Sequence, residues 1–206
     1  MEMANYEMYS AIAAIYGTIG AFSSLLGIVF FIFTSLGLYT LAKRRGIPRP
    51  GLAWVPAIGQ PWIVGSLADQ YDYLSEGKVK RQRQLLLWLN IGIWVLLFVF
   101  CGLLIAMIIN GVVSGTTYGP EAILSSTIGL IIAYGIMLIA AIVYSVFFYI
   151  ALYKVYKSCN PSNATLHLVL SIVIGATMPF FIFFNRNKDE GLPQRGQGSE
   201  EPNQIA

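Results

Sequence analysis

Residues 85–110 read LLLWLNIGIWVLLFVFCGLLIAMIIN, a run of 26 positions without a charged side chain. As an α-helix this run is about 39 Å long, which is enough to cross the ~30 Å hydrocarbon core of a bilayer. Only 11% of the 206 residues are charged and 56% are hydrophobic, whereas a soluble domain carries about 25% charged residues. The sequence therefore predicts an all-α integral membrane protein. We expect a helical bundle of three clear transmembrane helices and one further one, with a broken element between the first two.

The lysine and arginine residues set the predicted topology. They are absent from the N-terminal segment and gather at four places along the chain, namely 43–49, 78–83, 154–157 and 186–195. Basic loops stay on the cytoplasmic side of a membrane, so the N-terminus is expected outside. The expected spans are about 18–42, 85–110 and 122–153. The first apolar run is too long for the apolar part of a signal peptide, and we expect it to remain as an anchor.

The last apolar segment, Leu166 to Phe184, leaves two alternatives. Its 19 residues just reach the length of a span, but basic residues lie at both of its ends. Length favours a crossing over 166–184, whereas charge favours a segment that dips into the bilayer and returns at Pro179. We expect the crossing, and with it a single transmembrane domain over 1–190. Residues 191–206 lack periodicity and are expected to form a disordered tail.

The segment 51–68 reads GLAWVPAIGQPWIVGSLA and is apolar, but five of its residues are glycine or proline. A straight helix is unfavourable there, and basic clusters on both sides indicate that the chain enters and leaves on one face. We therefore expect a re-entrant or interfacial element. It is either a loop anchored by aromatic residues or the wall of a cavity. An amphipathic surface helix is expected next, over 66–76, because Leu67, Tyr71 and Leu74 share one face.

A shift of 114 residues aligns 37–55 with 151–169 and matches five positions of nineteen. In both copies a span meets lysine, the chain turns at proline or glycine, and an apolar element of 18 or 19 residues follows. If the repeat is genuine, 51–68 and 166–184 are structural counterparts. Parallel repeats of this kind occur in transporters.

Several motifs give the chain a resemblance to other proteins. They are AKRRGI (42–47), AWVP (53–56), WIVGSLADQY (62–71) and NPSNA (160–164). With these motifs the chain resembles a group of small uncharacterised polytopic membrane proteins of Gram-positive, clostridia-like bacteria. The resemblance implies a multi-pass protein of the bacterial cytoplasmic membrane and implies no activity.

Two sets of residues are candidate sites. The basic residues around the broken element face a leaflet that attracts cations by about 1 kcal/mol each, so they are candidate contacts to anionic lipids or phosphate: Lys43, Arg44, Arg45, Arg49, Lys78, Lys80, Arg81 and Arg83. The second set is a candidate cavity or acidic site: Trp54, Gln60, Trp62, Asp69 and Asp72. Asp69 and Asp72 lie one helical turn apart and suit a divalent cation or a phosphorylated substrate, although acids on a surface helix are usually only solvated.

Reactive groups are sparse elsewhere. No ionisable side chain lies deep in the expected spans, the single histidine excludes a zinc site or a catalytic triad built on histidines, and no cofactor is expected. Asn90 is expected to form an interhelical hydrogen bond.

Three functions remain open. The first is a non-enzymatic protein that acts through the lipid bilayer and its anionic lipids, as a homodimer or with a partner membrane protein. The second is a small transporter or pore with a cavity bounded by 51–68 and 166–184. The third is a membrane enzyme that uses Asp69 and Asp72. Nucleic-acid binding is not expected, because the net charge is only +3.

Overall fold

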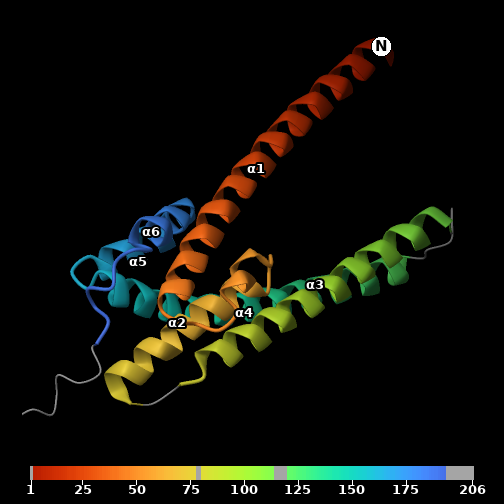
Figure 1. Cartoon of the computed structure of the whole chain (residues 1–206). Coiled ribbons are helices and arrows are strands. Elements are labelled where there is room, and N and C mark those ends of the chain that lie inside the picture. Colours follow the sequence, from red (N-terminus) through yellow and green to blue (C-terminus); the bar gives the residue numbers. More distant parts are fainter. Residues whose placement is uncertain (1, 78–79, 114–119, 194–206) are drawn as a thin grey trace, which may run out of the picture.

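A computed structural model describes residues 2–77, 80–113 and 120–193. In this part of the chain every regular element is helical (Figure 1). The elements are α1 (Glu2–Arg44), η1 (Pro50–Trp54), α2 (Gly59–Glu76), α3 (Gln82–Val113), α4 (Pro120–Cys159), α5 (Ala164–Val173), η2 (Gly175–Thr177) and α6 (Met178–Asn185).

Three helical stretches are long and apolar enough to cross a membrane: Met8–Arg44, Gln82–Ile109 and Thr127–Cys159. They overlap the three spans expected from the sequence, 18–42, 85–110 and 122–153, but the first begins earlier and the third begins and ends later. α3 and α4 run side by side, whereas the N-terminal part of α1 stands apart from both (Figure 1). Asn90 on α3 hydrogen-bonds the hydroxyl of Tyr144 on α4, which confirms the expected interhelical hydrogen bond.

η1 and α2 form a hairpin that starts and finishes near the C-terminal end of α1. Trp54 reaches Phe31, with ring centroids 6.4 Å apart, so the chain rises alongside α1. Gln60 then hydrogen-bonds Ser35 at 3.3 Å, and Gln70 at the other end donates to the carbonyl of Arg45 at 3.0 Å. The chain thus returns to the level at which it left α1, as the expected re-entrant element requires.

The expected break within 51–68 is shorter than the glycine and proline content suggests. The chain is irregular only at 55–58, and α2 then runs unbroken from Gly59 to Glu76. The helix expected over 66–76 is therefore present, but it begins seven residues earlier than expected. Pro61 lies in the first turn of α2, where its missing N–H has no intrahelical partner to lose. Gly65 lies so close to α3 that an added Cβ would come within 2.5 Å of the Cα of Arg83.

The expected fourth span over 166–184 is also wrong, because this segment folds back on itself. Helix α5 ends at Val173, η2 turns the chain, and α6 returns with proline in its first turn. Asn185 consequently lies 3.2 Å from Nδ1 of His167, and the N–H of Gly191 donates to the carbonyl of Ser158 at 3.2 Å. Residues 191–193 therefore belong to the folded part, and 194–206 of the expected tail lie outside the described residues.

The two hairpins occupy equivalent places. The first arms, η1 and α5, pack against the long helices that precede them, α1 and α4. The second arms cross over, because α6 packs against α1 and α2 packs against α4. Positions related by the 114-residue shift are buried alike: Leu38 and Leu152 are both 0% exposed, and Leu41 and Val155 are both 1% exposed. This arrangement supports the repeat expected from the sequence.

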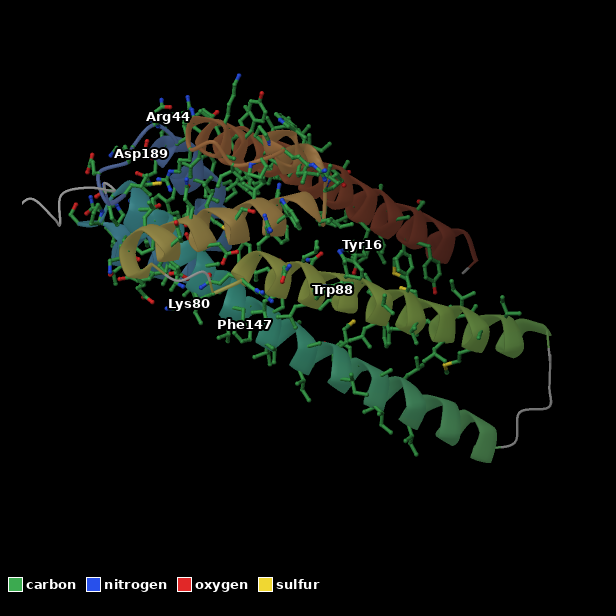
Figure 2. The ribbon with its side chains drawn as sticks, turned by 60° about the horizontal axis from the view of Figure 1, so that its bottom comes forward. Tyr16, Arg44, Lys80, Trp88, Phe147 and Asp189 are labelled. Atoms are coloured by element: carbon green, nitrogen blue, oxygen red, sulfur yellow. The ribbon has the colours of Figure 1, made fainter. Side chains whose placement is uncertain are left out.

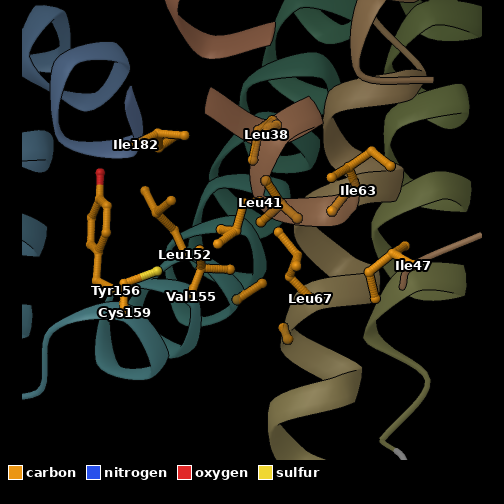
Figure 3. Close-up of a cluster of buried hydrophobic side chains, with 14 of the residues drawn as sticks. Leu38, Leu41, Ile47, Ile63, Leu67, Leu152, Val155, Tyr156, Cys159 and Ile182 are labelled. Atoms are coloured by element: carbon orange, nitrogen blue, oxygen red, sulfur yellow. The ribbon is translucent and has the colours of Figure 1, made fainter. Parts of the chain in front are cut away.

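The buried core lies where the hairpins meet the ends of α1 and α4 (Figure 3). It contains Leu38 and Leu41 from α1, Ile63 and Leu67 from α2, and Leu152, Val155 and Tyr156 from α4, among others. Elsewhere the long helices expose their apolar side chains, as residues 8–29 of α1 do. A membrane helix needs no water-excluding cover, because lipid is as apolar as its own side chains.

Candidate functional site

Charged side chains gather at one end of the molecule, where α1, α2, α4 and α6 finish and α3 begins. We call this the basic end, made up of the described residues 43–49, 69–77, 80–83, 154–160 and 185–193. Figure 2 shows Arg44, Asp189 and Lys80 at this end and Tyr16 well away from it.

Arg45 is the centre of the first cluster at the basic end. Its side chain is only 2% exposed and is held by Asp189, with Nε 2.9 Å and Nη2 2.8 Å from Oδ1. It also donates to Oγ of Ser158 at 2.7 Å and to Sγ of Cys159 at 3.4 Å. Nη2 of Arg44 lies 2.6 Å from the other carboxylate oxygen of Asp189, Oδ2. One carboxylate thus joins the end of α1, the end of α4 and the segment after α6.

Asp72 is the centre of the second cluster. Its side chain is 1% exposed, and Oδ2 lies 2.7 Å from Nζ of Lys154, which is itself 15% exposed. Gln82 donates to the same oxygen at 3.2 Å. The pair therefore joins α2, α3 and α4 away from water, which makes it far more sensitive to the loss of one partner than a surface pair is.

Asp69 has a third role, as a cap of α3. Its two carboxylate oxygens accept the backbone N–H groups of Gln82 at 2.7 Å and Arg83 at 3.1 Å. These N–H groups have no partner within the helix, and a negative charge at a helix N-terminus is favourable. The guanidinium of Arg83 lies 4.6 Å from the ring of Trp62. Both Arg83 Nε and Trp62 Nε1 are buried without a hydrogen-bond partner among the described residues.

These contacts change the interpretation of the two aspartates. They neither form the candidate site for a cation or phosphorylated substrate nor stand solvated as a pair, because Asp72 is buried on Lys154 and Asp69 caps α3. No group of three or more histidine, cysteine or acidic side chains suited to a metal ion occurs within the described ranges.

The other candidate cavity residues contact different elements. Trp54 is 41% exposed and packs edge-on against Phe31. Gln60 bonds to α1, whereas Trp62 faces Arg83 on α3.

The candidate lipid contacts fall into three groups. Arg44, Arg45 and Lys80 are ion-paired, the last with Glu76 at 2.9 Å, and the hydrogen bond to Glu76 raises the pKa of Lys80. Lys78 lies outside the described residues. The other four candidate lipid contacts make no ion pair with a described residue. Three basic residues outside the candidate set, at the same end, also make none. The seven are Lys43, Arg49, Arg81, Arg83, Lys157, Arg186 and Lys188.

A groove of about 580 Å³ lies between α4 and α5, and we call it the α4 groove. Its walls are mostly aliphatic and aromatic, and none of them comes from 51–68. The lining residues are Leu138, Ala141, Ile142, Ser145, Val146, Tyr149, Ile150, Tyr153, Lys154, Leu168 and Ile172.

The sequence analysis missed Lys154 and Asp189 as partners. A usable signal was present for Lys154, which follows the apolar residues of the third span and precedes Val155 and Tyr156. A lysine with apolar neighbours on both sides needs a carboxylate partner. No comparable signal marks Asp189. No family model, curated protein or solved structure matches the chain.

Proposed function

We propose that the chain is a non-enzymatic, multi-pass protein of the bacterial cytoplasmic membrane that binds anionic lipids at its basic end. The observation that carries this proposal is the set of seven basic side chains without an ion pair among the described residues, gathered at one end of three apolar helices. Each basic residue near an anionic leaflet contributes about 1 kcal/mol to attraction.

The proposed topology places the basic end in the cytoplasm and the N-terminus outside. Both hairpins return to the basic end, so residue 193 lies on the same side as 43–49. A fusion after residue 206 is therefore expected to be fluorescent with a fluorescent protein and inactive with alkaline phosphatase. The opposite pattern contradicts the topology.

The transporter alternative has less support. It required a cavity bounded by 51–68 and 166–184, whereas the α4 groove takes Leu168 and Ile172 from the second segment and nothing from the first. Its apolar walls suit a hydrocarbon chain better than a polar solute.

Lipid binding is tested by thermal unfolding of the purified protein in neutral detergent. We expect added phosphatidylglycerol to raise the unfolding temperature more than added phosphatidylcholine, and the difference to shrink with salt. The variant Lys43→Gln/Arg49→Asn/Arg81→Asn removes three unpaired charges. Asparagine is chosen at the last two because Arg49 and Arg81 have φ of 58° and 52°, a conformation that asparagine tolerates.

The matched control is Lys80→Gln, which removes a basic residue that is already paired. The triple variant is expected to lose most of the phosphatidylglycerol preference, and the control to keep it. Equal stabilisation of the wild type by the two lipids refutes the proposal.

A further inference from the structure

The α4 groove lies on a helix that is long and apolar enough to span a membrane, and it is open on the side away from the core. Val146 and Ile150, two of its lining residues, are 53% and 46% exposed. Its volume is within the ~300–1,000 Å³ range of small-molecule sites. In the proposed topology it therefore faces lipid hydrocarbon.

The composition of the groove changes along α4. Toward the middle of the helix it is lined by Leu138 and Ile142, whereas toward the basic end it is lined by Tyr149, Tyr153 and Lys154. Aromatic residues with a polar tip are typical of the membrane interface. The groove thus has an apolar end and a polar end.

The stripe of groove residues continues to Lys157. Helical neighbours lie three and four positions apart, and Lys157 follows Lys154 by three and Tyr153 by four. Lys154 is held by the buried Asp72. Lys157 is exposed and makes no ion pair with a described residue, so its charge is free to meet an anion at the polar end of the groove.

We propose that the α4 groove binds one acyl chain of an anionic phospholipid, with the lipid phosphate at Lys157. This inference rests on the proposed function and gives it a defined site. Half of the hydrocarbon core and one headgroup layer together span about 20 Å, which is roughly 13 residues of helix. A phosphate at Lys157 therefore places the end of the acyl chain at the level of Ile142 and Ser145, which line the groove.

The proposal is tested with a phosphatidylglycerol that carries a photoreactive diazirine in its acyl chain. The full chain is reconstituted in phosphatidylcholine nanodiscs with a small fraction of this probe, and labelled peptides are identified by mass spectrometry. We expect labelling to concentrate on 142–153 and 168–172. An excess of phosphatidylglycerol should displace the probe at least fivefold better than phosphatidylcholine.

Two pairs of variants make the test specific. Val146→Trp fills the groove and is expected to reduce its labelling at least fivefold. Val143→Trp makes the same change at a position that is 40% exposed and does not line the groove, and it should leave labelling within twofold. Lys157→Gln is expected to abolish the preference for phosphatidylglycerol in the groove. Lys80→Gln, which removes a basic residue already paired with Glu76, should preserve it.

Three results overturn the inference. The first is labelling spread equally over the exposed face of α1 and the groove, which is ordinary contact with bulk lipid. The second is groove labelling that Val146→Trp leaves unchanged. The third is cross-linking of the groove to a second polypeptide in place of lipid. If any of these appears while phosphatidylglycerol still stabilises the protein, only the groove assignment fails. If that stabilisation is also missing, the proposed function fails with it.

Discussion

The ion pair between Asp72 and Lys154 gives the sharpest test of the packing at the basic end. Its atoms are 2.7 Å apart, and the two side chains are 1% and 15% exposed. Removal of one partner from a buried pair costs about 3–5 kcal/mol, because the remaining charge stays buried without compensation. We therefore expect Lys154→Met to lower the free energy of unfolding by about 3–5 kcal/mol. Asp72→Asn should cost less, because the asparagine carbonyl still accepts a hydrogen bond from Gln82.

The double variant Asp72→Leu/Lys154→Met completes a thermodynamic cycle with the two single variants. Replacement of a whole buried pair by apolar residues is often neutral or stabilising, so the double variant should be more stable than Lys154→Met alone. Unfolding by sodium dodecyl sulfate in mixed micelles, followed by circular dichroism, measures each free energy. Lys80→Gln is the surface control. Its pair with Glu76 is about half exposed and screened by solvent, so we expect little or no loss of stability. A cost for Lys154→Met no larger than that of the control refutes the reasoning.

Three further predictions concern the second hairpin. Gly37→Ala on α1 brings a Cβ within 2.8 Å of the side chain of Ile182 and 3.0 Å of its backbone carbonyl carbon, so it should destabilise the protein by about 1–3 kcal/mol. The control Gly27→Ala places its Cβ in open space and should be neutral or slightly stabilising in the same unfolding assay. The side-chain amide of Asn185 donates a hydrogen bond to the carbonyl of Phe181 and a second one to Nδ1 of His167, so Nδ1 is the unprotonated ring nitrogen. Burial of the ring, together with the positive charge of Lys188, lowers the pKa of His167. The folded state thus binds fewer protons than the unfolded state. Stability should be complete above pH 6.5 and fall as the pH drops below it, while His167→Gln should flatten this dependence in thermal scans. Asp189 holds Arg45, which contacts the thiol of the buried Cys159. In a Cys101→Ser background, Asp189→Asn should therefore speed the labelling of Cys159 by a maleimide, whereas the control Glu190→Gln should not. Equal labelling rates for the two variants contradict the role given to Asp189.

The long helices were predictable because charge-free runs leave few alternatives in a membrane. The return of the segment after 51 to the end of α1 was predictable too, because basic residues on both sides indicate that the chain enters and leaves on one face. The reversal of 166–184 was not, because length and charge gave opposite answers there. The chain reverses around Gly175 and Pro179, where a straight helix would have to continue.

The candidate site was less predictable than the fold. Lys43, Arg44 and Arg45 are equivalent in sequence, yet Arg45 is buried and Lys43 is exposed. That difference depends on where Asp189 lies, and no local pattern links residues 144 positions apart. The same holds for Asp72, whose partner comes from α4.

The crossing of the second hairpin arms, α6 onto α1 and α2 onto α4, has a consequence for synthesis on the ribosome. The surface of α1 around Gly37 stays uncovered until α6 packs against it, and α6 is the last helix of the described chain to be synthesised. Neither half of the repeat therefore encloses its own core. A chain stopped after α4 would leave Leu38, Leu41 and Arg45 incompletely covered, so quality-control proteases should remove it while sparing the finished protein.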